Sequence, residues 1–391
     1  MATLDKVVRS AEVVGSVQDI TDFVTALNPD ETFYLNRFGK TSVTNTKHEW
    51  LNDGLRPAMD NATLEAVEFD VQKARPRTRG LNYVQQLMAG YSVSDTTQAI
   101  KKYGVRDEMA YQMVKAGKEF ARDLEYAIVN QKEAKAEDST PARFGGIGYF
   151  LEASMPVAAI DATGKCTVTG HGLFNGDPVI FAAAPTGGAL DSNYKPNTPY
   201  YVHVVDNNNF TVHSTPQEAQ AGAAATGIKP SAAVTAGKMV CSNQNLVDAN
   251  AVSGANAGKL TFDLLNDAMQ LAWKRGGKID SIVCSPKNKR VISGFTQGVQ
   301  KTREQSKKEL VEVIDVLETD FGRVDVTPHR MYADDVVDLM EYQYWKLGYL
   351  IPIHTENPPR TGTFNQKVIT GSATVECTAP IASARIKGIK K

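Results

Sequence analysis

The chain has 391 residues, of which 43 are Lys or Arg and 44 are Asp or Glu, so its formal net charge is −1. This length allows two or three domains, and the charge balance argues against tight nucleic-acid binding. The first residues, MATLDKVVRSAEVVGS, are charged throughout and lack the apolar core of a signal peptide. No apolar run approaches the roughly 18 residues of a membrane span, so we expect no membrane partner.

The four cysteines form no C-x-x-C pair, and the histidines are scattered along the chain. We therefore expect a reduced set of thiols and no metal site. A bridge between Cys166 and Cys241, near the two ends of one unusual segment, is the alternative.

Residues 1–28 are predicted to be a polar N-terminal arm. The next segment, ETFYLNRFGKTSVTNTKHEWLNDGL (31–55), contains two β-prone runs, Thr32–Phe38 and Thr41–Trp50, on either side of Gly39-Lys40. Glycine suits a hairpin turn, so this pattern predicts a long polar hairpin. An isolated hairpin is marginally stable in water, and this one should therefore lie on another surface.

Two motifs in this segment resemble functional sites but lack required residues. Gly39-Lys40-Thr41 is not a phosphate-binding loop, because the glycine needed five residues before Gly39 is Tyr34. His48-Glu49 does not begin a zinc site, because position 52 is Asn rather than His. The chain also lacks a G-x-S-x-G nucleophile elbow. We expect neither an enzyme nor a bound cofactor.

Residues 104–138 are predicted to form one long amphipathic helix. Apolar side chains recur there at three- and four-residue spacing, at Met109, Met113, Ala116, Phe120 and Leu124. A helix of about 30 residues is roughly 45 Å long, longer than an ordinary core helix. Such a helix would act as a structural spine.

Residues 156–240 differ in composition from both flanks. Nine of these 85 residues are charged, whereas charged residues make up 22% of the whole chain. YYVHVV and NFTVHS flank a DNN turn, which predicts a hairpin. We expect a small all-β, Ig-like module inserted at an exposed loop, with His203 and His213 at surface positions.

The last third returns to mixed structure. LTFDLLNDAMQLAWKRGG predicts a helix that ends at two glycines, and a buried strand and a second helix, KNKRVISGF, follow it. Short strands dominate from Val311 to Ile351 and again at the end of the chain.

Several of these segments, in this order, resemble the major capsid proteins of tailed phages, which have the Hong Kong 97-type fold. The local pattern is similar to that of the siphophage-type capsid family, at Thr32, Phe33, Thr44, Asn45, Glu49, Trp50, Asp53 and Leu55. Phe33 stands where that family usually has Pro. The resemblance covers nearly all of the chain except residues 156–240.

The resemblance implies an α+β fold with a set division of the chain. The expected parts are the arm 1–28, an extended loop 29–80, a peripheral domain 81–155 with the spine helix 104–138, the inserted β domain 156–240, an axial domain 241–359 and C-terminal strands 360–391. In this fold the extended loop lies across a neighbouring subunit, which would provide the support that the hairpin needs.

The implied function is self-assembly into pentamers and hexamers of an icosahedral shell that encloses double-stranded DNA through weak, non-specific contacts. Implied partners are a portal and a separate scaffolding protein, and the implied location is the virion, assembled in the host bacterial cytoplasm. The candidate inter-subunit contacts are Phe33, Phe38, Lys40, Glu49 and Trp50. Alternatives are an encapsulin-like bacterial compartment and a carbohydrate-binding or adhesive surface protein.

Overall fold

The computed structural model describes residues 32–56, 58, 60, 62, 65, 75–101, 105, 107–183, 190–222, 226–235, 238–252, 256–295 and 316–390. The predicted N-terminal arm, residues 1–28, lies outside this range. The chain divides into two compact units. The smaller contains the described residues of Met88–Phe120 and Ile353–Thr370, and the larger contains those of Glu31–Leu87, Ala121–Pro352 and Gly371–Lys391.

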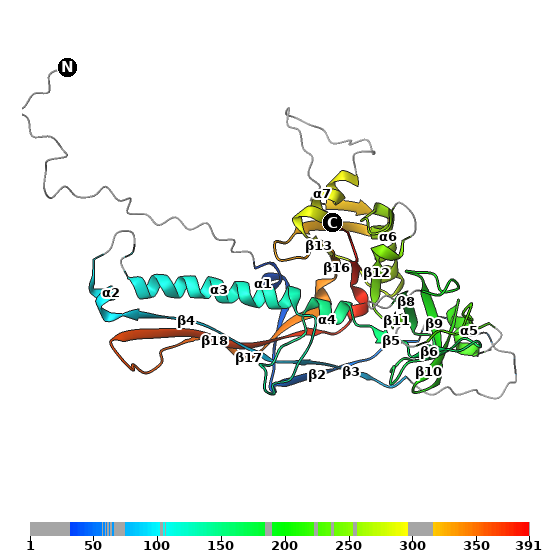
Figure 1. Cartoon of the computed structure of the whole chain (residues 1–391), viewed down its shortest axis with the longest axis horizontal. Coiled ribbons are helices and arrows are strands. Elements are labelled where there is room, and N and C mark those ends of the chain that lie inside the picture. Colours follow the sequence, from blue (N-terminus) through cyan, green and yellow to red (C-terminus); the bar gives the residue numbers. More distant parts are fainter. Residues whose placement is uncertain are drawn as a thin grey trace, which may run out of the picture. The chain divides into compact units, whose positions relative to one another are not determined.

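Helix α3 (Glu108–Asn130) is the long amphipathic helix that the sequence predicts, and it is the long coil in Figure 1. Its apolar stripe is buried, at Met109, Ala116, Phe120, Leu124 and Ile128. The helix is shorter than predicted, because residues 131–138 (QKEAKAED) offer no large apolar side chain to bury, and propensity alone rarely sustains a helix. After the helix the chain turns back, and Lys135 and Arg143 form a β-bridge.

A four-stranded sheet has the order β1-β17-β18-β4. Its strands are β1 (Gly39–Ser42), β17 (Trp345–Glu356), β18 (Phe364–Cys377) and β4 (Gln85–Ser94). Strand β4 leads into a short helix, α2 (Asp95–Ala99), which the Ser94 hydroxyl caps by accepting the Thr97 N–H. Strand β1 pairs with β17 in parallel.

The prediction of a hairpin turn at Gly39-Lys40 is wrong. These two residues begin strand β1, and the run before them forms a helix, α1 (Phe33–Arg37). A helix places Tyr34 and Phe38, four residues apart, on one side, and both are buried there. Tertiary packing therefore outweighs the β propensity of this aromatic run.

A two-stranded antiparallel ribbon does occur in the predicted extended-loop region, but with other strands. It consists of β2 (Lys47–Asn52) and β3 (Thr78–Tyr83). Lys47 lies opposite Tyr83 at what we call the near end, and Asn52 lies opposite Thr78 at the far end.

Residues 155–242 contain one seven-stranded sheet with the order β5-β11-β8-β9-β10-β7-β6. Its strands are β5 (Met155–Pro156), β6 (Ala159–Ile160), β7 (Lys165–Thr167), β8 (Pro178–Ala183), β9 (Pro199–Asp206), β10 (Asn209–His213) and β11 (Met239–Ser242). A short helix, α5 (Pro216–Ala221), follows β10. Apolar residues of these strands, including Phe181, Val202, Phe210 and Cys241, form a separate core.

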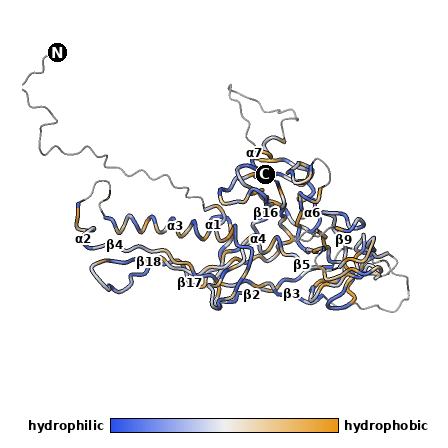
Figure 2. Tube along the Cα trace, in the orientation of Figure 1, coloured by the Kyte–Doolittle hydropathy of each residue, from blue (hydrophilic) through white to orange (hydrophobic). Residues whose placement is uncertain are grey.

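The two outer strands of this order, β5 and β6, are consecutive in the chain, so the sheet closes on itself. Val157 donates its N–H to Met239 on one side, and Ala158 donates its N–H to Thr167 on the other. The result is a small closed barrel, which we call the barrel module, rather than the expected Ig-like sandwich. Both architectures share alternating strands, and only long-range pairing distinguishes them. In Figure 2 the barrel strands mix hydrophobic and hydrophilic segments, as this alternation requires.

A six-stranded mixed sheet has the order β12-β19-β16-β13-β15-β14. Its strands are β12 (Asn245–Asp248), β13 (Ser281–Cys284), β14 (Val316–Thr319), β15 (Gly322–Pro328), β16 (Val337–Met340) and β19 (Ala384–Lys387). Helices α6 (Phe262–Lys274) and α7 (Pro286–Gly294) share its apolar core. The Thr261 hydroxyl caps α6, and Gly276 follows the helix with a φ of 87°, which confirms the predicted glycine stop. Another short helix, α4 (Ile147–Leu151), lies in the chain just before the barrel module.

Candidate subunit-contact surfaces

Helix α1 brings two predicted contact residues, Phe33 and Phe38, against the chain's own core. Phe38 exposes only 4% of its surface and stacks on Trp345, with 5.6 Å between the ring centroids. Phe33 is half-buried and lies edge-on to Tyr342. The expectation that Phe38 anchors another subunit is therefore corrected, because its ring already stabilises its own chain. Phe33 retains part of its surface for such a contact.

A buried carboxylate, which the sequence reading missed, holds α1 in place. Glu125 of α3 accepts the Tyr34 N–H at 2.8 Å and the Leu35 N–H at 3.2 Å. His329 places Nε2 3.1 Å from the same carboxylate, and its Nδ1 accepts the Met331 N–H at 3.2 Å. That second bond fixes the proton on Nε2, so the imidazole donates to Glu125. Glu125 and His329 are fully buried, and together these contacts dock the start of α1 on the spine helix.

A second buried network joins α1 to the six-stranded sheet. Arg385 forms two parallel hydrogen bonds to Asp338, both 2.6 Å long, across the neighbouring strands β19 and β16. Its remaining nitrogen, Nη1, lies 2.6 Å from a Glu152 oxygen. The Tyr332 hydroxyl donates to Asp338 at 2.5 Å and also contacts the Tyr34 hydroxyl. The position of α1 thus depends on several elements that are far apart in the sequence.

The ribbon has two different faces. Lys47, Glu49 and Leu51 lie on its exposed face. Glu49 lies 2.5 Å from Lys47 and 3.2 Å from Arg79 of the partner strand. Leu51 beside them exposes 63% of its surface. This exposed face carries Glu49, which the sequence selects as a contact candidate, and also Leu51, which the sequence does not select.

The opposite face of the ribbon packs on the body of the chain. The Trp50 ring lies 6.0 Å from Phe150 and covers Gly80 of β3, where an added Cβ would come within 2.5 Å of the indole. His48 is 2.9 Å from Glu376 of β18. Trp50 therefore attaches the ribbon to its own subunit while part of its surface stays exposed, so its contact with a neighbour stays a prediction.

The last predicted contact residue, Lys40, is exposed, but it lies in strand β1 opposite Leu347 and not at a hairpin tip. Among the described residues, the apolar side chains that expose more than half of their surface are Leu51, Leu55, Met88, Ile100, Val114, Tyr126, Val205 and Trp273. Scattered exposed apolar residues are ordinary on a monomer. Leu51 and Leu55 differ because they lie four residues apart at the far part of the ribbon.

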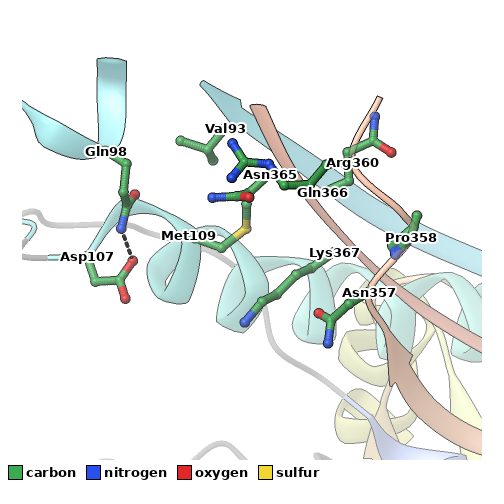
Figure 3. A pocket seen from close by; sticks show the side chains of 10 residues that line it. All are labelled: Val93, Gln98, Asp107, Met109, Asn357, Pro358, Arg360, Asn365, Gln366 and Lys367. Atoms are coloured by element: carbon green, nitrogen blue, oxygen red, sulfur yellow. Dashed lines mark hydrogen bonds between the residues drawn. The ribbon is translucent and has the colours of Figure 1, made fainter. Parts of the chain in front are cut away.

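The smaller unit contains a polar hollow of about 400 Å³. Figure 3 shows the side chains that line it: Val93, Gln98, Asp107, Met109, Asn357, Pro358, Arg360, Asn365, Gln366 and Lys367. Asp107 accepts a hydrogen bond from Gln98 at 2.7 Å, which is the main cause of its lowered pKa. Arg360 pairs with Asp95. The lining holds amides and paired charges, with no histidine, cysteine or serine to act as a base or nucleophile.

Side chains elsewhere that could carry chemistry have structural partners. Ser285 accepts the Asn288 N–H and caps α7, while the His329 ring binds Glu125 as described. The rings of His203 and His213 lie 6.3 Å apart in the barrel module. The expected surface position is wrong for His213, which is fully buried and lies within hydrogen-bonding distance of the Thr211 and Thr226 hydroxyls. Within the described ranges, no three His, Cys, Asp or Glu side chains are grouped to hold a metal ion.

All four cysteines are free and buried, so the bridge between Cys166 and Cys241 is not present. Burial raises the pKa of Cys241 to about 12. Among the helices of the described residues, none has the length and apolar character needed to cross a membrane.

Comparison with known proteins gives the family. The protein-family model described as SU10 major capsid protein matches residues 6–390 of this chain. The major capsid protein of Escherichia phage Phieco32 is 30% identical over 117 residues, which cover 30% of this chain and 33% of that protein. The matched segment thus spans a third of that relative's length.

Two solved structures align with nearly all of this chain. The mature capsid of bacteriophage PhiM1 aligns over 98% of this chain and 96% of that chain, with 9% identity and a TM-score of 0.51. The capsid of the native GTA particle aligns over 97% of each chain, with 9% identity and a TM-score of 0.49. The similarity to the PhiM1 capsid protein confirms the predicted α+β fold of the Hong Kong 97 type.

The family match extends over nearly the whole chain, and the family is one of structural capsid proteins rather than of enzymes. The prediction of a phage major capsid protein, a component of the virion, is confirmed. The chain belongs to the SU10 major capsid protein family.

Proposed function

We propose that this chain assembles with itself into pentamers and hexamers of an icosahedral shell that encloses double-stranded DNA. The match of residues 6–390 to a major capsid family carries this proposal. Permanent assemblies bury thousands of Å² per subunit, so such a chain must present apolar surface. The role is structural, and the proposal assigns no catalytic step to the chain.

The exposed face of the ribbon is the proposed contact with a neighbouring subunit. Leu51 exposes its apolar side chain there, Glu49, Lys47 and Arg79 form a charged group on the same ribbon, and the exposed Leu55 follows three residues after the end of β2. An apolar centre with a charged rim is the usual composition of a protein interface. The opposite face packs largely on the body of the same chain and offers less surface for this contact.

Contacts with DNA are proposed to be weak and independent of sequence. The formal net charge of −1 gives no strong attraction to phosphate, since tight binding requires many Lys or Arg contacts. A lining that repels or only weakly binds the genome lets it be packed and released. Assembly is proposed to occur in the host cytoplasm with a portal and a separate scaffolding protein.

The test is assembly of the purified chain, with and without a co-expressed scaffolding protein, followed by electron microscopy and sedimentation. Leu51→Ser should reduce closed particles by at least about tenfold, because one interface leucine contributes on the order of 1.5–3 kcal/mol and the loss recurs at each copy. Val205→Ser is the matched control, since Val205 is also exposed but lies on the barrel module. Equal yields from both variants would refute the ribbon contact, and a wild-type chain that stays monomeric with scaffold would refute the shell.

A further inference from the structure

The far end of the ribbon is bound to the chain's own barrel module through one arginine. Arg75 lies three residues before Thr78, which is the first residue of strand β3. Its Nη1 lies 2.9 Å from Asp177 Oδ1, and its Nη2 lies 3.2 Å from Asp177 Oδ2. The guanidinium carbon lies 4.5 Å from the centroid of the Phe174 ring. This is a two-point ion pair with a cation–π contact, which fixes both the distance and the orientation of the guanidinium.

Asp177 is held rigidly in the barrel module. It is 5% exposed and follows a tight turn in which its carboxylate accepts the Phe174 N–H at 3.0 Å. Its own N–H donates to the Phe174 carbonyl, and its carbonyl accepts the Val202 N–H. Burial raises the pKa of Asp177, whereas the Phe174 N–H and the guanidinium groups of Arg75 and Arg275 act to lower it. A fixed, buried carboxylate of this kind is costly without a cationic partner.

The segment that follows strand β2 lies beside Arg75. A Cβ built on Gly54 would lie 3.5 Å from the Arg75 guanidinium carbon, so Gly54 is a near neighbour of this group with room for one more carbon between them. Gly54 follows strand β2, and Arg75 precedes strand β3. The contact therefore joins both sides of the ribbon, just beyond the last strand pair, Asn52 and Thr78, to one residue of the barrel module.

The barrel module is in turn tied to the six-stranded sheet's helix α6 near the same point. Arg275, the residue that ends α6, donates to the Asn243 carbonyl at 2.5 Å and lies 3.4 Å from the Pro178 carbonyl. Burial lowers its pKa to about 10, while Asp177 acts in the opposite direction. Two guanidinium groups, one from the ribbon and one from α6, thus act on the same carboxylate.

We propose that the barrel module is a positioning element for the ribbon, and that Asp177 is the residue that holds the ribbon's far end. A two-stranded ribbon is marginally stable alone, and this one is attached at His48 toward its near end, at Trp50 in its middle and at Arg75 beyond its far end. Attachment at both ends fixes the direction in which the exposed face with Leu51 points. The module is therefore part of the assembly machinery and not a removable decoration. The expected effect of this attachment on particle assembly rests on the proposed function.

The test compares Arg75→Ala with Arg77→Ala. Arg77 is the matched control because it lies two residues away, its side chain is 69% exposed, and its ion pair among the described residues is a 3.6 Å contact with the exposed Asp53. Hydrogen exchange of the full-length soluble chain measures opening of the ribbon directly. Loss of the buried, charge-assisted contact should speed exchange at residues 47–52 and 78–83 about tenfold in Arg75→Ala. Exchange in the barrel strands should stay at the wild-type rate.

Asp177→Asn approaches the same contact from the barrel side and should give the same faster exchange in the ribbon. Equal ribbon exchange in Arg75→Ala and Arg77→Ala would overturn the positioning role, even if Asp177→Asn fails to fold. Particle yield is the second measurement, and Arg75→Ala should lower it several-fold relative to Arg77→Ala. Faster exchange with unchanged yield would overturn the consequence for assembly. Failure of every variant and of the wild type to form particles would count against the proposed function, while the exchange data still decide the inference.

Discussion

Replacing Glu125 with Gln should destabilise the chain by about 3 kcal/mol through the docking of α1. Glu125 is fully buried and receives three donors, from Tyr34, Leu35 and His329. A glutamine keeps the shape of the side chain but replaces one acceptor oxygen with an NH2 group. That group would then face a backbone N–H, and two donors would meet head to head.

The magnitude follows from these three contacts. If the amide oxygen takes the place of Oε1, the bonds from Tyr34 and His329 survive but lose their charge, at about 1 kcal/mol each. The Leu35 N–H loses its acceptor, which costs about 1–3 kcal/mol for a buried donor. Removing a buried charge returns part of this loss, because the carboxylate no longer has to be desolvated. The sum is about 3 kcal/mol.

Chemical denaturation of the soluble chain, followed by circular dichroism, measures this loss. Asp123→Asn is the control, since Asp123 lies two residues earlier on the same helix but is exposed, and it should change stability by less than about 0.5 kcal/mol. Proteolysis should also cleave near α1 faster in Glu125→Gln. If Glu125→Gln is as stable as the control, the carboxylate does not hold α1 in solution and the proposed docking is refuted.

Trp50→Ala should lower the unfolding free energy by about 2 kcal/mol because the indole packs on its own chain, and an unchanged denaturation midpoint would contradict this. Gly80→Ala should destabilise similarly, since its Cβ would overlap the indole, and a neutral effect in the same assay would show that Trp50 does not cover this position. For Glu152, burial acts to raise the pKa, but Arg385 and Lys132 outweigh it and hold the pKa below its ordinary 4.5. A lowered folded-state pKa gives stability that is present at neutral pH and is lost as the pH falls below about 4.5. Thermal melts at about pH 6 and about pH 3.5 should show this loss, and a Glu152→Gln variant with the same acid loss as wild type would exclude Glu152 as its source.

The parts of the fold that the sequence predicts well depend on local patterns. The apolar spacing of α3 identifies the helix and its buried side, because neighbours three and four residues apart share one face. Gly276 marks the end of α6 by its backbone conformation. The low charge of residues 156–240 separates this segment from its flanks. Each of these signals lies within a few dozen residues of what it predicts.

The features that the sequence does not predict depend on contacts between distant residues. Strand β1 pairs with β17, some 300 positions later, and no local pattern indicates this partner. Helix α1 forms in an aromatic, β-prone run because Glu125 and Trp345 provide its binding surface. One local signal existed, since Glu125 lies between Leu124 and Ile128 on the buried part of α3. A carboxylate at such a position requires a partner, although the sequence cannot say which one.

The contact candidates divide in the same way. The family pattern selected Glu49 and Trp50 as contact candidates, and both lie in strand β2 of the ribbon, but the pattern did not show which face each one occupies. Strand pairing assigns Glu49 to the exposed face and Trp50 to the body. Leu51 was missed because a single leucine in a polar strand carries no signal until the register is known.

A cryo-electron-microscopy reconstruction of particles assembled from the purified chain tests the central claim most directly. We predict a closed icosahedral shell in which the exposed face of the ribbon, with Leu51, contacts a neighbouring subunit while Arg75 stays bound to Asp177 of its own chain. A chain that remains monomeric with its scaffolding protein, or a shell in which this face contacts only solvent, would contradict the account.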